Sequence, residues 1–137
     1  MSTEANKALF RRMIEEFWNQ KKLDTAAEFF SADTYSPSVP GLPPGPDGVK
    51  FFAQVFLAAF PDLQITIDQI VASGDEVAGR LIQKGTHKGD FMGIPASGKW
   101  VEFTEMAILK IVDGKIAVSW YQTDMLSLMR QIGAIPT

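Results

Sequence analysis

The spacing of hydrophobic positions changes near Pro61. Before it, apolar residues recur at intervals of three and four, as on one face of a helix. This spacing predicts a first helix that Ser2 or Thr3 can cap, a shorter helix over residues 23–30, and a helix that starts near Pro46 and stops at Pro61. The apolar face of the first helix comprises Leu9, Phe10, Met13, Ile14, Phe17 and Trp18.

After Pro61 the apolar residues alternate with polar ones, a pattern typical of half-buried strands. Leu63, Ile65 and Ile67 open the first strand, and further strands are predicted over about residues 77–87, 101–112 and 116–123. Asp113-Gly114 is the pair that a type I′ hairpin turn requires. A last apolar stretch over residues 125–132 predicts a terminal helix, with Gly133 as its C-cap.

Two segments between these elements are predicted to be loops. Residues 35–47 contain five prolines and two glycines, which exclude regular structure. A loop of this length is either a lid over a binding site or a plain connection. Residues 88–99, with three glycines and one proline, form a second loop between strands. We therefore predict one α+β domain over residues 1–137, with helices on one face of a curved antiparallel sheet that encloses a pocket.

The composition narrows the chemistry that such a pocket can carry. Ten Phe and three Trp indicate a bulky apolar interior or cavity wall, whereas the lack of Cys and the single His argue against a zinc cluster or a thiol nucleophile. The net charge is −3, and the Lys and Arg residues are scattered along the chain. The sequence therefore shows no basic cluster of the kind that binds nucleic acid or an anionic membrane. The polar N-terminus predicts no signal peptide or membrane anchor, so we expect a cytoplasmic protein.

Asp124 is the first candidate for acid–base chemistry. Residues on one strand face recur at every second position, so Asp124 shares a face with Trp120 and Gln122. In an apolar cavity its pKa would rise, and the carboxyl could accept and return protons. Asp124 also directly precedes the last helix, where Asp is a good N-cap. The spacing leaves both interpretations open.

Three other charged or titratable residues lie within the predicted strands: His87, Glu105 and Arg80. His87, at the end of the second strand, could relay protons or donate to a carbonyl oxygen, although an exposed or satisfied polar role is the favoured interpretation. Glu105, between Phe103 and Ala107 along one strand face, could be a second pocket carboxylate, but a solvent-facing position is favoured. Arg80 is expected to face solvent or a dimer contact.

Several segments in this order resemble the SnoaL-like polyketide cyclases of the nuclear-transport-factor-2-like superfamily. They are Pro40–Val49, Ala59-Phe60-Pro61-Asp62-Leu63, Gly85–Lys99, Asp113-Gly114-Lys115-Ile116, and Trp120 with Asp124. The resemblance covers nearly the whole chain. It implies a cone-shaped fold around one deep apolar cavity, and association as a homodimer or homotetramer.

The resemblance also implies a reaction. The characterised cyclases close the last ring of an aromatic polyketide by an intramolecular aldol condensation, without metal or cofactor, and an aspartate that corresponds to Asp124 acts as base and acid. His87 matches the histidine of the family's Gly-Thr-His motif and would line the same cavity. We expect a small apolar or aromatic ligand in a pocket that includes Trp120, Gln122, Phe17, Tyr35, Phe56, Phe91 and Met92.

Two departures from the family pattern leave alternatives open. Many members carry a histidine near Tyr35-Ser36-Pro37-Ser38, and many read Glu-His-Trp where this chain has Val118-Ser119-Trp120. Loss of both histidines favours a non-catalytic binding protein of the same fold. A ketosteroid isomerase-like enzyme would need a phenol near its base, from Tyr35 or Tyr121, and an epoxide hydrolase-like enzyme would need Arg80 in the cavity.

Overall fold

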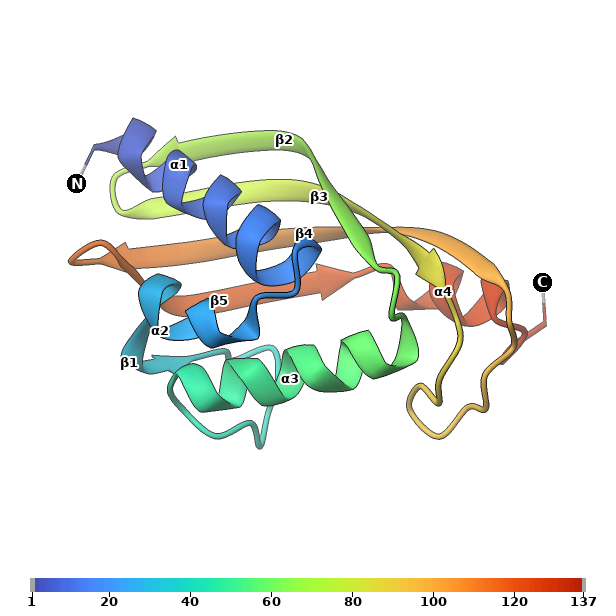
Figure 1. Cartoon of the computed structure of the whole chain (residues 1–137). Helices are drawn as coiled ribbons and strands as arrows, with labels where there is room; N and C mark the ends of the chain where they lie inside the picture. The colour runs from blue at the N-terminus through green and yellow to red at the C-terminus, as the bar shows by residue number, and fades with distance from the viewer. Residues whose placement is uncertain (1, 137) are drawn as a thin grey trace.

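The computed structural model describes residues 2–136 and shows helices packed against one face of a strongly curved sheet (Figure 1). The first helical stretch is α1 (Thr3–Arg12), capped by the Ser2 hydroxyl, which accepts from the backbone N–H of Ala5 at 3.1 Å. It continues as the π-helical segment η1 (Met13–Asn19). The remaining helices are η2 (Leu23–Thr25), α2 (Ala26–Phe29), α3 (Pro46–Ala59) and α4 (Met125–Gln131).

The sheet has five strands in the order β1-β5-β4-β3-β2. β2 to β5 pair antiparallel as predicted, and β1 adds a parallel edge strand beside β5. The bounds are β1 (Phe30–Tyr35), β2 (Gln64–Ser73), β3 (Glu76–Thr86), β4 (Trp100–Val112) and β5 (Lys115–Thr123).

β1 is the main departure from the predicted elements. The helix expected over residues 23–30 ends at Phe29, and the chain continues directly into the strand. Only Phe30 and Thr34 of β1 are buried, so the segment lacks the alternation that marks the longer strands. Pairing with β5 holds it in place, and this long-range contact has no local sequence signal.

Turns and caps follow their local chemistry. Asp113 and Gly114 both have positive φ, +50° and +76°, as a type I′ turn requires. Pro46 begins α3, and Gly133, at φ +82°, follows the end of α4 and donates its N–H to the carbonyl of Arg130. These residues set the positions at which the strands and helices start and stop.

The proline-rich loop runs along the edge of β5. The Ser36 hydroxyl donates to the carbonyl of Ser119 at 2.6 Å, and the Ser38 hydroxyl accepts from the backbone N–H of Tyr121 at 3.0 Å. The loop is therefore fixed beside the strand that, as described below, forms one wall of the interior cavity.

Candidate functional site

The interior between the helices and the sheet contains a small inner cavity that continues into a wider groove. The inner cavity, of about 20 Å³, lies under α1 and holds little more than one water molecule. The groove measures about 530 Å³, within the range of about 300–1,000 Å³ that is typical of small-molecule sites. Four residues line both the inner cavity and the groove and so mark the junction between them: Phe52, Phe56, Glu105 and Tyr121.

Glu105 is the carboxylic acid at this junction. It lies on the inward face of β4, where Val101, Phe103, Ala107 and Leu109 at alternate positions are all buried. Its carboxylate accepts from the Thr123 hydroxyl at 2.7 Å. Although the residue retains some exposure through the groove, protein atoms surround the carboxyl, and this desolvation raises its pKa above the ordinary value of 4.5.

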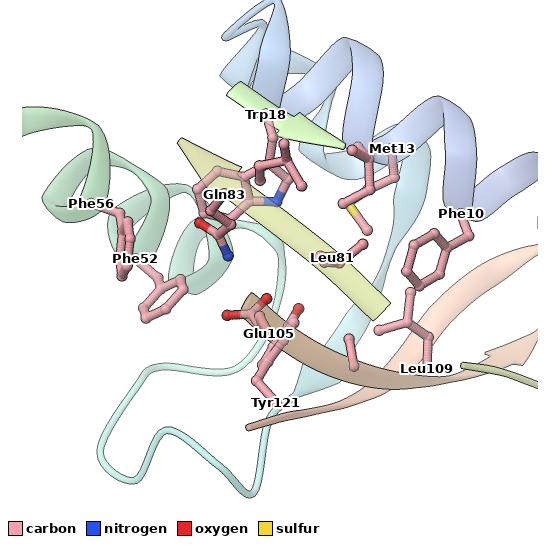
Figure 2. A pocket seen from close by; sticks show the side chains of 13 residues that line it. Phe10, Met13, Trp18, Phe52, Phe56, Leu81, Gln83, Glu105, Leu109 and Tyr121 are labelled. Carbon is pink, nitrogen blue, oxygen red and sulfur yellow. The ribbon is translucent and has the colours of Figure 1, made fainter. Parts of the chain in front are cut away.

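Two polar groups oppose that rise in pKa. Hydrogen bonds from Thr123 and from the side chain of Gln83 favour the charged carboxylate, but desolvation outweighs them. Gln83 is itself buried, and it lies on the inward face of β3 between Leu81 and Gly85. Figure 2 shows its amide directed toward Glu105. The result is a carboxyl that is held in place and whose raised pKa suits it to accept a proton and return it.

Tyr121, on β5, lies beside Glu105. Figure 2 shows the phenol and the carboxyl directed into the same space. Burial raises the pKa of Tyr121 to about 12, with a further contribution from the nearby Glu105 charge, while a hydrogen bond from the Ser119 side chain acts in the opposite direction. The phenol is therefore neutral over the physiological range and can act as a hydrogen-bond donor.

Aromatic side chains from η1 and α3 form the wall that faces these polar groups. Trp18 and Phe52 meet edge to face with ring centroids 6.3 Å apart, and Phe52 contacts Phe56 at 5.9 Å. Phe91, from the loop before β4, also lines the groove, and its ring centroid lies 5.4 Å from that of Phe56. Such a surface suits a planar apolar ligand.

The structure places Asp124 outside this cavity. Its carboxylate caps α4, accepting from the backbone N–H of Ser127 at 3.1 Å, and the residue is exposed. Of the two placements left open by the spacing, the N-cap is the one observed. Asp124 does not line the inner cavity or the groove.

Asp124→Ala is expected to lower the free energy of unfolding by about 1 kcal/mol, the usual value of an N-cap side chain. Chemical denaturation measures the change, and Asp124→Asn is the control because Asn caps nearly as well as Asp. Equal stability of all three proteins would contradict the capping role.

His87 is fully buried but also lies outside the cavity lining. Its Nδ1 accepts from the backbone N–H of Ser97 at 3.1 Å, which puts the ring proton on Nε2 in the neutral form. The ring lies against Phe60, with centroids 5.6 Å apart. His87 thus fastens the loop before β4 to the end of α3, and does not line the inner cavity or the groove as the resemblance implied.

Trp120 differs from the prediction, because a register shift in β5 reverses the face that meets the inner cavity. Ile111 pairs with Ile116, but Lys110 pairs with Val118, so Ala117 is an extra residue in β5. From there onward Ser119, Tyr121 and Thr123 share the face of Glu105. Trp120 pairs with the exposed Ile108 on the outer face, whereas Gln122, although exposed, lines the groove as predicted.

The other predicted pocket residues divide among three places. Phe56, Phe91 and Met92 line the groove, and Met92 is exposed. Tyr35, also exposed, lines a side cavity beneath the proline-rich loop, with Val39 and Trp18. Phe17 is fully buried in the core against Phe30 and lines none of these spaces.

Sequence reasoning wrongly favoured a solvent-facing position for Glu105, did not single out Gln83, Trp18 or Phe52 as lining residues, and named Tyr121 only as one of two candidate phenols. A signal existed for the first two, because each is a polar residue inside a run of apolar residues at every second position. The signal for Tyr121 was absent, because the extra residue in β5 changes the phase of the alternation. Within residues 2–136, no three His, Asp or Glu side chains come together as a metal site would require.

Arg80 lies on the outer face of β3 and forms an ion pair with Asp68 of β2. The inward residues of β3 are its neighbours Gly79 and Leu81, which are buried. An epoxide hydrolase-like site that relies on Arg80 in the cavity is therefore not present. Among the helices of the described part of the chain, none has the length and apolar character needed to cross a bilayer.

Comparison with known proteins identifies the family of this chain. The family model of the SnoaL-like polyketide cyclases matches residues 8–132. The aklanonic acid methyl ester cyclase DnrD of Streptomyces peucetius is 30% identical over 137 residues, covering 97% of this chain and 92% of the relative. The corresponding cyclase DauD of Streptomyces sp. (strain C5) is 31% identical over 130 residues, covering 91% and 80%.

Solved structures show the same fold. TsrD from Streptomyces laurentii superposes with a TM-score of 0.91 at 26% identity, covering 98% of this chain and 99% of that one. AclR from Streptomyces galilaeus, described as a candidate hydroxylase, superposes with a TM-score of 0.85 at 34% identity, covering 99% and 85%. With its cone-shaped α+β fold and a family match over most of its length, this chain belongs to the SnoaL-like polyketide cyclases.

Proposed function

We propose that this chain is a cofactor-independent cyclase or isomerase that acts on an apolar aromatic carbonyl compound by acid–base catalysis. The observation that carries the proposal is the Glu105 carboxyl, whose pKa is raised and which lies at the back of an aromatic groove. The cyclase relatives act on aklanonic acid methyl ester, and we take an aromatic polyketide as the substrate class.

The reaction needs only one group that accepts and returns a proton. The Glu105 carboxylate removes a proton from the carbon next to a carbonyl, and the resulting enolate carbon bonds to a second carbonyl carbon of the same molecule. The oxygen of that second carbonyl then takes the proton back from the Glu105 carboxylic acid. The product is an isomer of the substrate, and the enzyme returns to its starting state.

Glu105 and Asp124 are the two candidates for the acid–base residue. Asp124 corresponds to the family's catalytic aspartate, but its carboxylate is exposed and caps α4. Glu105 is desolvated, is oriented by Thr123 and Gln83, and opens onto the groove. We therefore propose Glu105 as the base, with Asp124 as the alternative that separate variants distinguish.

The direct test is hydrogen exchange in a simple substrate analogue. β-Tetralone is an apolar aromatic ketone with exchangeable hydrogens next to its carbonyl. In D₂O, the protein is expected to accelerate deuterium incorporation at these carbons, measured by NMR, above the rate in buffer. Binding of β-tetralone without any acceleration would contradict the catalytic proposal and support the non-catalytic binding protein that the two missing histidines favour.

The rate of this exchange is expected to depend on pH through Glu105. The base must be ionised, so the rate rises as the pH passes the raised pKa of Glu105, which lies above 4.5, and then stays level. The folded protein also holds this proton more tightly than the unfolded chain. The contribution of Glu105 to the free energy of unfolding is therefore present below pH 4.5 and is lost as the pH rises through the raised pKa of Glu105.

Rates and denaturation midpoints across the pH range measure both effects, with Glu105→Gln as the comparison for stability. An inflection of the rate at the pKa of an ordinary exposed carboxylate would count against Glu105.

The homodimer or homotetramer expected from the resemblance remains a prediction. The outer face of the sheet exposes Val71, Met106 and Ile108, which is the apolar surface that such an association would cover.

A further inference from the structure

We propose that the phenol of Tyr121 is a second catalytic group, which donates a hydrogen bond to the substrate carbonyl next to the carbon that Glu105 deprotonates. This inference rests on the proposed function, in which Glu105 is the base. It assigns the two groups opposite roles, one as proton acceptor and one as hydrogen-bond donor, on the same substrate.

The sheet register brings the two groups together. Thr123 pairs with Glu105, and Tyr121 pairs with Ala107, so Tyr121 lies diagonally across from Glu105 on the inward face. Both residues line the inner cavity and the groove. In Figure 2 the carboxyl and the phenol point into one space from neighbouring strands, as they would to reach adjacent atoms of one ligand.

The backbone of Tyr121 is anchored, and the neighbouring Glu105 carboxylate has hydrogen-bond donors other than the phenol. The backbone N–H of Tyr121 donates to the Ser38 hydroxyl at 3.0 Å, which ties this part of β5 to the proline-rich loop. The Ser119 side chain lies near the phenol and lowers its pKa in part. Glu105 takes its own hydrogen bonds from Thr123 and Gln83, so the carboxylate has other donors.

The chemistry of the reaction calls for such a donor. When the carboxylate removes the proton, negative charge moves from the carboxylate onto the carbonyl oxygen of the substrate. A fixed donor in a site that excludes water stabilises this charge more than the neutral carbonyl, and so lowers the barrier. The ionisation of the phenol only near pH 12 keeps it a donor over the whole working range.

Tyr35 is the only other tyrosine in the chain, and its position does not suit this role. It is 55% exposed and lines the side cavity beneath the proline-rich loop, which Glu105 does not line. The structure therefore separates two residues that the sequence left equivalent.

Tyr121→Phe removes the donor and keeps the ring. It is expected to slow deuterium incorporation into β-tetralone on the order of 10²-fold, the loss seen when one preorganised oxyanion donor is removed. Thermal melting confirms that the variant folds. An exchange rate equal to that of the wild type in a folded variant would overturn the inference.

A second measurement does not depend on turnover. In a Glu105→Gln background, the carbonyl stretching band of bound β-tetralone is expected at lower frequency than in an apolar solvent, because a hydrogen bond weakens the C=O bond. Adding Tyr121→Phe returns the band to higher frequency, whereas adding Tyr35→Phe leaves the band where it was. A band that does not respond to Tyr121→Phe would contradict the proposed hydrogen bond.

The two proposals fail in different ways. If Glu105→Gln exchanges as fast as the wild type, the proposed function through Glu105 is wrong. If Glu105→Gln is slow but Tyr121→Phe matches the wild type in both rate and carbonyl frequency, Glu105 remains the base and only the role of Tyr121 is wrong.

Discussion

Glu105→Gln is expected to lower the rate of deuterium incorporation into β-tetralone by on the order of 10²- to 10⁴-fold, the usual contribution of one positioned acid–base group. Gln has nearly the shape of Glu and retains hydrogen-bonding capacity toward Thr123, but it cannot accept a proton from carbon. The loss is expected in the rate at saturating β-tetralone, with little change in affinity, because the aromatic wall that binds the ligand is unchanged.

The matched control lies on the same strand. Glu102 is also on β4, but its side chain is 57% exposed and pairs with Lys84 on the outer side. Glu102→Gln makes the same chemical change outside the cavity and is expected to leave the exchange rate within about twofold of the wild type, since surface changes of this kind cost at most about 0.5 kcal/mol.

Asp124→Asn decides between the two carboxylates. If the cap is its only role, this variant exchanges β-tetralone at close to the wild-type rate. If instead Asp124→Asn is inactive while Glu105→Gln is active, the catalytic assignment belongs to Asp124, and α4 must open or shift for its carboxylate to reach the groove.

Phe10→Ala is expected to destabilise the fold by about 3–5 kcal/mol, the range for removal of a buried Phe side chain. Phe10 is completely buried, and the tip of its ring approaches the backbone of β3 at Gly79, which leaves room for it. A Cβ atom on Gly79 would lie 2.6 Å from Cζ of Phe10.

Urea denaturation measures the loss, and Phe51→Ala is the control. Phe51 is on α3 with 58% of its surface exposed, so the same truncation is expected to cost little there. Phe10 also lines the inner cavity, so Phe10→Ala enlarges this space. Similar losses of stability for the two variants would contradict the packing of α1 on β3.

The element boundaries were predictable where a short stretch of chain carries its own signal. Asp113-Gly114 requires positive φ at both positions, and Pro46 and Pro61 suit the start and the stop of one helix. The alternation of Leu63, Ile65 and Ile67 reflects burial of one strand face. In each of these cases the physical cause lies within a few residues in the sequence, and the structure agrees.

The candidate site was predictable only in part. Glu105 and Gln83 interrupt runs of apolar residues at every second position, which is a readable signal of inward polar groups. An acid in such a run is more commonly excluded from the interior, because burial of a charge is costly. The hydrogen bonds from Thr123 and Gln83 offset part of that cost here, and they come from two other strands.

The sequence by itself therefore determined the order of helices and strands except for β1, the Phe-rich interior and, through the family resemblance, the cone-shaped fold around a cavity. Only the tertiary structure decided which polar groups meet in that cavity. One extra residue in β5 turned Tyr121 inward and Trp120 outward, and the start of α4 took the carboxylate of Asp124 for its cap. The reason is physical: alternation gives which residues share a face, but the register between strands and the competition for hydrogen bonds determine which face meets the cavity.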